Sequence, residues 1–145
     1  MVEITNSKPM PPLLEMTQKS STPLHAIEIN VDCQFVEKRD SSNEERYLFA
    51  YTISIRNNGS IAAKLLTRHW IVTDANSKIQ EVKGEGVIAK QPHLKPGEEH
   101  HYSSAAMIET SVGTMQGSFR MIDDNGEEFD APIEQFVLSI PRTLH

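Results

Sequence analysis

The chain has 145 residues, of which 38% are hydrophobic, and a formal net charge of −6. This length fits a single domain with its own core, and the acidic balance argues against a protein that binds nucleic acid through a basic surface. Because Cys33 is the one cysteine, no intrachain disulfide can form, which fits a reducing compartment. The sequence has neither a secretory signal pattern nor a membrane-length apolar stretch, so we expect a cytoplasmic protein without membrane insertion.

Residues 1–22 are predicted to form a flexible N-terminal leader, and residues 23–145 a single domain. The leader contains Pro9, Pro11 and Pro12 among polar residues, and proline disfavours regular structure around it. The alternative is a partner-binding tail whose anchors are its apolar side chains. These anchors are Met10, Leu13, Leu14 and Met16.

Two alternating segments predict the first two strands. Apolar and polar residues alternate over 27–35 and again over 47–55, which is typical of half-buried strands. Cys33 falls on the apolar face and is predicted to be a core residue. The polar run 37–45 between the two segments is interpreted as a solvated loop. Asn57-Asn58-Gly59-Ser60 then predicts a turn, so the two strands should be antiparallel or lie in facing sheets.

A third strand is predicted over residues 63–74, with Leu66, Arg68, Trp70 and Val72 on one face. Its other face is also partly apolar, which indicates an interior strand. The tryptophan is expected in the core, covered by the aliphatic stem of Arg68.

Four more strands are predicted along the rest of the chain, over residues 78–83, 100–107, 112–122 and 133–140. Gly113 and Gly117 stand in register within one of them, which suggests a close backbone approach or a bulge. A helical pattern is absent. Seven or so strands joined by turn signals predict an all-β, antiparallel β-sandwich.

A glycine-containing loop is the main candidate for ligand binding. The candidate residues are Gly84, Gly86, Val87, Ala89 and Lys90. A dinucleotide fingerprint needs a helix after its glycines, and Pro92 and Pro96 exclude that helix here. Phosphate binding would therefore need a nest of backbone amides supported by lysines. The alternative is a loop whose glycines only allow tight turning.

Other polar clusters are weak candidates. His100 and His101 are adjacent, so on a strand they face opposite sides, and His93 lacks a metal-ligand spacing to either. The carboxylates of residues 123–130 surround a hairpin turn and are interpreted as a solvated acidic turn. We therefore predict no catalytic set, no metal site and no cofactor.

Three long segments together resemble the ApaG family, which is also called CorD. They read RYLFAYTISIRNNG, RHWIVTDANSKIQEVKGEGVIAKQPHLKPGEEHHYSS and GTMQGSFRMIDDNGEEFDAPIEQFVLSIP, and the resemblance covers residues 24–145. It implies an immunoglobulin- or fibronectin-III-like sandwich. The family is associated with cobalt and magnesium efflux and, by gene neighbourhood, with diadenosine tetraphosphate hydrolysis. Related domains in larger eukaryotic proteins are regarded as protein-interaction modules, and a pyrophosphate-binding role has been suggested for the glycine loop.

The resemblance thus favours a non-enzymatic binding module with an unknown protein partner. Its contact surfaces are expected at Met107-Ile108, at Val87-Ile88 and in the leader. The alternative is a sensor that binds pyrophosphate or a nucleotide, with or without a divalent cation, at Gly84 to Ala89. Sheet edges also allow a homodimer. An enzyme that hydrolyses phosphoanhydrides is disfavoured, because the carboxylates show no evident arrangement around a nucleophile.

Overall fold

The structure is a computed structural model that describes residues 22–41, 43–88 and 90–141. These residues form eight β-strands and no helix. The strands are β1 (Ile27–Ser41), β2 (Glu44–Asn57), β3 (Ala63–Asp74), β4 (Ile79–Glu85), β5 (His93–Leu94), β6 (Glu99–Ile108), β7 (Val112–Asp123) and β8 (Glu128–Ser139).

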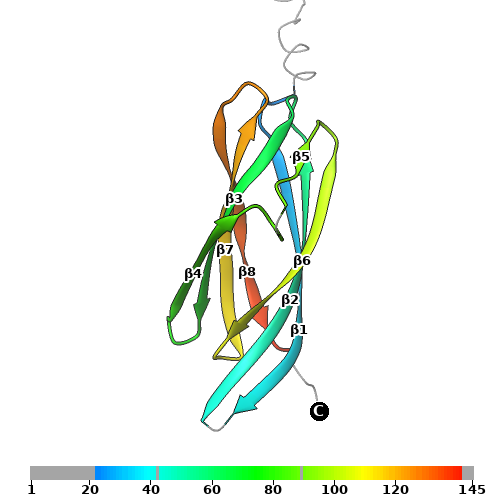
Figure 1. The fold of residues 1–145 in the computed structure, drawn as a ribbon. Helices are drawn as coiled ribbons and strands as arrows, with labels where there is room; N and C mark the ends of the chain where they lie inside the picture. The colour runs from blue at the N-terminus through cyan, green and yellow to red at the C-terminus, as the bar shows by residue number, and fades with distance from the viewer. Residues whose placement is uncertain (1–21, 42, 89, 142–145) are drawn as a thin grey trace, which may run out of the picture.

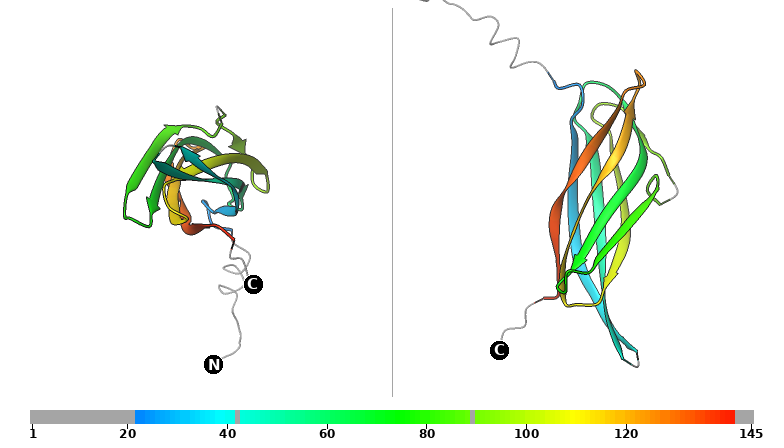
Figure 2. Two further views of the ribbon diagram at one scale, coloured as in Figure 1. Left: turned by 90° about the horizontal axis from the view of Figure 1, so that it is seen from below. Right: turned by 90° about the vertical axis from the view of Figure 1, so that its left-hand side faces the viewer.

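The strands form two antiparallel sheets. One has the order β1-β2-β6 and the other β4-β3-β7-β8, with the short β5 paired to β3. Figures 1 and 2 show the two sheets face to face as a long sandwich, with β4 splayed away from β6 at one side. The predicted fold class, an all-β immunoglobulin- or fibronectin-III-like sandwich, is confirmed.

The core lies between the two sheets and is centred on aromatic side chains. Trp70 on β3 is 2% exposed, and its ring lies edge-on to Phe119 and Phe136. Tyr51 on β2 contacts the same indole with a centroid distance of 5.6 Å. Because Tyr51 belongs to one sheet and the other rings to the opposite sheet, the tryptophan joins both layers, as predicted.

The predicted loop over residues 37–45 is wrong. β1 continues to Ser41 and β2 begins at Glu44, so the two strands form one long hairpin that extends past the core. The side chains there are mostly solvated on both faces, which made the segment look like a loop. The backbone ladder and cross-strand ion pairs such as Lys38–Glu45, at 3.0 Å, keep it extended.

The predicted faces of β3 are also wrong at its start. The register of β3 against β7 shifts between Leu65 and Thr67, which marks a bulge at Leu66. A bulge moves one residue out of the alternation. Leu65 therefore shares the core with Trp70 and is fully buried, whereas Leu66 is half-buried.

Both expectations for the glycines of β7 are confirmed. A Cβ atom at Gly117 would lie 2.0 Å from the carbonyl oxygen of His69, and the register shifts between Met115 and Gly117. A Cβ at Gly113 would lie 2.6 Å from the carbonyl oxygen of Thr73. Strands β3 and β7 thus approach each other so closely that a side chain has no room.

The predicted leader lies outside the described residues apart from Thr22, and its proposed anchors lie outside them as well. Cys33 packs against the core as predicted, and burial raises the pKa of its thiol. Within the described residues, no helix has the length and apolar character needed to cross a membrane.

Candidate functional site

The predicted glycine loop consists of the end of β4 and the tight turn after it. Gly84 lies within β4 opposite Arg68, and Gly86 follows the strand with a φ of 62°. A Cβ at Gly86 would lie 2.1 Å from the carbonyl oxygen of Lys90. Both the φ angle and the lack of space therefore require glycine at this position.

The backbone amides of Gly86, Val87 and Lys90 in this loop are already hydrogen-bonded. The amide of Gly86 donates to the carbonyl of Leu66 at 2.8 Å, and Val87 and Lys90 exchange amide–carbonyl bonds of 2.7 and 3.0 Å. Ala89 lies outside the described residues. An anion nest needs free amides that point toward one place, so a phosphate at this loop would depend on side chains. Phosphate binding here stays a prediction.

Arg68 is the side chain that covers the loop. Its guanidinium lies against Gly84, where an added Cβ would be 2.6 Å from Nη1. Nη1 donates to the carbonyl oxygens of Glu85 and Gly86 at 3.1 and 3.0 Å. Among the described residues, Arg68 has no carboxylate within ion-pair distance. The guanidinium holds the loop through Nη1, and no hydrogen bond of its other N–H groups is found among the described residues.

A buried tyrosine lies near this guanidinium. The Tyr102 hydroxyl is buried and has no hydrogen-bond partner of ordinary geometry among the residues that the structure describes, although the Trp70 side chain lies near enough to act on its pKa. Burial raises the pKa of Tyr102 well above its usual range, while the charge of Arg68 opposes this rise. Burial likewise lowers the pKa of His100, assisted by the charge of Lys90. The charge of Arg68 thus acts on Tyr102, and the charge of Lys90 acts on His100.

The histidines that the sequence singled out do not converge. His100 is half-buried, whereas its neighbour His101 is exposed and lies 3.2 Å from Glu99. His93 bonds Asp124 at 2.8 Å. The predicted separation of the adjacent pair is thus confirmed.

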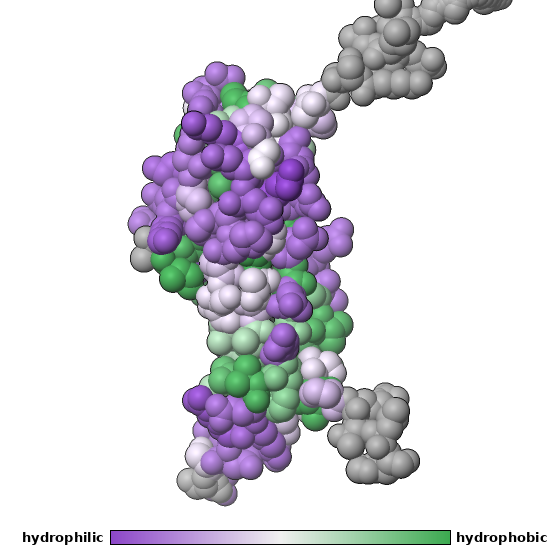
Figure 3. Space-filling view, turned by 90° about the vertical axis from the view of Figure 1, so that its right-hand side faces the viewer, coloured by the Kyte–Doolittle hydropathy of each residue, from purple (hydrophilic) through white to green (hydrophobic). Residues whose placement is uncertain are grey.

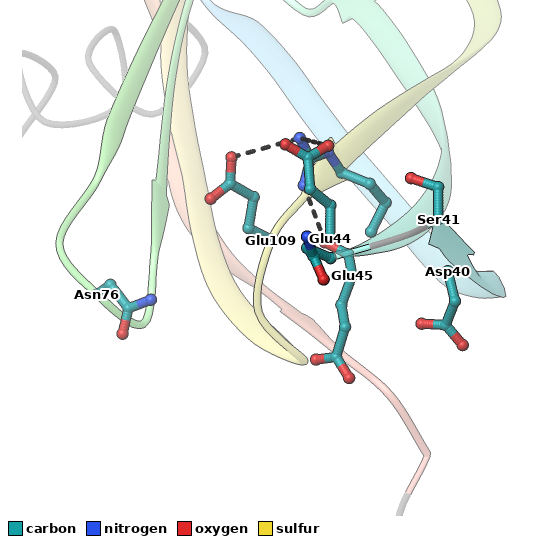
Figure 4. Close-up of a pocket in the computed structure, with 8 residues that line it drawn as sticks. Asp40, Ser41, Glu44, Glu45, Asn76 and Glu109 are labelled. Carbon is teal, nitrogen blue, oxygen red and sulfur yellow. Dashed lines mark hydrogen bonds and ion pairs between the residues drawn. The ribbon is translucent and has the colours of Figure 1, made fainter.

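One groove, with a volume of about 660 Å³, lies at one end of the molecule, between the β1–β2 hairpin and the turn after β3 (Figure 4). It is lined by Asp40, Ser41, Asn43, Glu44, Glu45, Arg46, Asn76 and Glu109. Most of its carboxylates already have a cation. Arg46 pairs with Glu44 and Glu109 at 3.0 and 3.7 Å, and Lys78 lies 2.6 Å from Glu109, which lowers the pKa of that carboxyl. A bound cation would have to displace these partners.

A second groove, of about 590 Å³, crosses the outer face of the larger sheet. It brings Ser118 opposite His69, and His69 bonds Glu81. This order resembles a catalytic triad, but no hydrogen bond joins Ser118 to His69 within the described part of the chain. A nucleophile needs that bond to be activated by its base. Ser118 is therefore not activated by His69 in this arrangement.

An apolar surface lies on the outer face of the three-stranded sheet, which we call the outer-face patch. Its members are Val36, Leu48, Ala50, Ala105 and Met107. Leu48 pairs with Met107 and Ala50 with Ala105 across β2 and β6. Val36 is the extra residue of a bulge opposite Leu48 and is 49% exposed. Figure 3 shows green and pale surface interrupting the polar face at this level.

The surfaces expected from the sequence are only partly exposed. Met107 belongs to the outer-face patch, whereas Ile108 is fully buried in the core. Ile88 is 56% exposed, whereas Val87 is 1% exposed. Strand alternation turns Met107 outward and Ile108 inward, whereas Ile88 lies in the turn after β4 with a φ of 48°.

Comparisons with known proteins agree on one family. The profile of the ApaG domain matches residues 37–123. Protein ApaG of Stenotrophomonas maltophilia is 50% identical over 122 residues, covering 84% of this chain and 96% of that protein. Protein ApaG of Azotobacter vinelandii is 46% identical over 125 residues, or 86% and 99% of the two chains. A solved Bordetella pertussis structure named ApaA is 39% identical with a TM-score of 0.78, covering 85% and 99%. The chain therefore belongs to the ApaG family.

Proposed function

We propose that this ApaG-family chain is a non-enzymatic binding module that docks a partner protein on the outer-face patch. The proposal rests on one observation, an apolar surface on the outer face of a sheet, in which Val36 and Ala105 are exposed and Leu48, Ala50 and Met107 are half-buried. Contiguous apolar surface on a soluble domain often marks an interaction site. On this proposal, the partner and not this chain would carry out the cobalt and magnesium efflux with which the family is associated.

The occupant that we propose is a different protein rather than a second copy. A stable interface buries about 1,200–2,000 Å², more than five residues including two alanines provide. The patch is therefore suited to be the apolar centre of an interface with a charged rim. Because the chain has a net charge of −6, two copies repel each other, whereas a basic partner is attracted. We expect the partner to present an apolar side chain surrounded by Lys or Arg.

Site-specific photo-crosslinking in cells tests this proposal. A crosslinking amino acid at Ala105 probes the patch, and the same group at Ser103 is the matched control, because it is exposed on the same face two residues away. We expect a discrete heterologous adduct from position 105 only. Equal adducts from both positions would contradict a specific patch, and an adduct of twice the chain mass would identify a second copy as the occupant instead.

The affinity of the purified partner provides the second measurement. Met107→Glu places a charge in the patch and should weaken binding at least tenfold, while Ser103→Glu should leave the dissociation constant unchanged. Titration calorimetry measures both. Equal affinities for the two variants would refute docking at the patch.

Binding of a phosphate-bearing ligand beside Gly84–Ala89 is the second candidate function. It is favoured by the half-buried guanidinium of Arg68, which has no carboxylate within ion-pair distance in the described part of the chain. A guanidinium is well suited to pyrophosphate because it presents paired N–H donors. The occupied loop amides count against it, so the site would depend on Arg68.

Arg68→Gln is therefore the test variant, since Gly86→Val would distort the loop through its φ and its contact with Lys90. Lys78→Gln is the control, because Lys78 lies before β4 and pairs with Glu109 at the other end of that strand. Pyrophosphate, ATP and diadenosine tetraphosphate, with and without Mg²⁺, should stabilise the wild type by about 2.7 kcal/mol at a hundredfold excess over the dissociation constant. Loss of this shift in Arg68→Gln alone would support the site, and a flat panel would exclude it.

A further inference from the structure

One histidine outside the sites above is held in a fixed position. His25 precedes β1, where the amide of Asn58 donates to the carbonyl of Ala26 at 2.7 Å and the amide of Ser60 donates to that of Pro23 at 3.0 Å. The imidazole ring stacks on Phe129 of β8, with a centroid distance of 3.8 Å and an interplanar angle of 8°. Backbone bonds on both sides and the ring stack therefore fix the direction of its nitrogens.

Asp123, at the end of β7, meets this ring with a buried carboxylate. Its side chain is 0% exposed, and Oδ2 lies 2.7 Å from His25 Nε2. The other oxygen, Oδ1, accepts the backbone amides of Asn125 and Glu127 at 2.8 and 3.0 Å. Because those amides occupy Oδ1, the carboxylate is oriented with Oδ2 toward the imidazole.

Glu127 adds a second carboxylate to the pair. One ligand atom from each of His25, Asp123 and Glu127 lies within 4.8 Å of the other two. Ligand atoms about 2.0–2.2 Å from one ion are at most about 4.4 Å apart, so only a small movement is needed. Glu127 is exposed at the hairpin turn, and its side chain is free to make that movement.

We infer that His25, Asp123 and Glu127 form a binding site for a divalent transition-metal ion of the zinc and nickel class. The ion would replace the proton between His25 Nε2 and Asp123 Oδ2 and bind a Glu127 oxygen, with water in the remaining positions. An imidazole combined with carboxylates suits such ions, whereas Mg²⁺ prefers oxygen ligands alone. Binding would link the segment before β1 to the β7–β8 hairpin, far from the outer-face patch.

The same turn provides a matched control. His93 bonds Asp124 at 2.8 Å, so it is a histidine–aspartate pair one residue away from the proposed site. The grouping of three metal-ligand side chains found among the described residues contains His25 and not His93. If both are ordinary ion pairs, added Zn²⁺ or Ni²⁺ should affect the rings of His25 and His93 equally. If His25 belongs to a metal site, the ion should affect the His25 ring and not the His93 ring.

Titration with Zn²⁺ and Ni²⁺, followed by calorimetry and by the NMR signals of the histidine rings, tests the inference on the full chain. We expect one strong site, release of protons on binding and a selective shift of the His25 ring. Glu127→Gln should weaken binding at least tenfold without loss of the fold, because Glu127 is exposed. His25→Gln should abolish the site, and His93→Gln should leave it unchanged.

Two results would overturn the inference. One is an unchanged dissociation constant in a folded Glu127→Gln protein. The other is an ion that shifts the rings of other histidines and leaves His25 unaffected, which would indicate adventitious surface binding. Neither result bears on protein docking at the outer-face patch, because the two experiments use separate residues and readouts.

Discussion

Three glycines of this fold are required for different physical reasons, and substitutions should separate those reasons. Gly126 in the β7–β8 turn has a φ of 85° and open space around its Cα, whereas Gly117 has no room for a Cβ beside His69. Gly86 combines both constraints. Asn tolerates the left-handed conformation better than Ala does. Where there is no room for a Cβ, however, no residue other than glycine fits.

We therefore predict that Gly126→Ala lowers the free energy of unfolding by about 1–2 kcal/mol and that Gly126→Asn recovers part of that loss. Gly117→Ala should cost about 1–3 kcal/mol through overpacking, and Gly117→Asn should cost more than the alanine. Urea denaturation of the four variants measures the differences. Recovery of stability by asparagine at position 117 would contradict the steric explanation.

At the scale of elements, the length and period of the apolar pattern predicted the strands well. The bounds of β3 agree with the sequence pattern, because its turn signals lie at both ends. The hairpin of β1 and β2 was missed beyond Phe35, because its extension is held by backbone pairing and not by burial. The two-residue β5 was missed because it is too short to show an alternation of apolar and polar residues. The bulge at Leu66 depends on pairing with β7, which local sequence does not specify.

The candidate sites were harder to predict than the strands. In the sequence, the glycines identified the loop over residues 84–89 as a candidate site. Only the structure shows that Arg68 covers Gly84 and that the amides of Gly86, Val87 and Lys90 are hydrogen-bonded. The cluster of His25 and Asp123 joins residues 98 positions apart, beyond any sequence spacing. Part of the outer-face patch can be recognised in the sequence, because Leu48 and Ala50 are apolar residues at outward positions of an alternating strand.

Strand β4 is expected to contribute little to the stability of the core. It extends past the edge of the three-stranded sheet, so Val82, which pairs with Trp70 on the inner face, is still 42% exposed. Val82→Thr should therefore change the free energy of unfolding by less than about 0.5 kcal/mol. The same substitution at Val72, which is 5% exposed, should cost about 1–3 kcal/mol because it buries a hydroxyl. Equal costs, measured by chemical denaturation, would mean that β4 is covered in solution.

For the whole molecule, the segment before β1 and the β7–β8 hairpin share one polar contact across the end of the sandwich. The hydrogen bond from His25, followed by the amides of Glu127 and Asn125, lowers the pKa of Asp123. His25, Glu127 and the His93–Asp124 pair are the titratable groups that face or flank this carboxylate. The contact joins the beginning of the described chain to its last hairpin, so its charge state affects the global stability.

The sign of the pH dependence follows from that lowered pKa. A carboxyl that is more acidic in the folded state stabilises the fold above its unfolded pKa of about 3.9, and this contribution is lost as the pH falls through the folded value. Asp123→Asn keeps an acceptor for the two amides but removes the charge. We expect the variant to be less stable than the wild type at pH 7 and the difference to shrink below about pH 4. Other carboxyls with lowered pKa, such as Glu109, titrate in both proteins and cancel in the comparison. Unfolding free energies measured from pH 7 to pH 2 decide the point, and a constant difference over that range would show that Asp123 acts through packing and not through its charge.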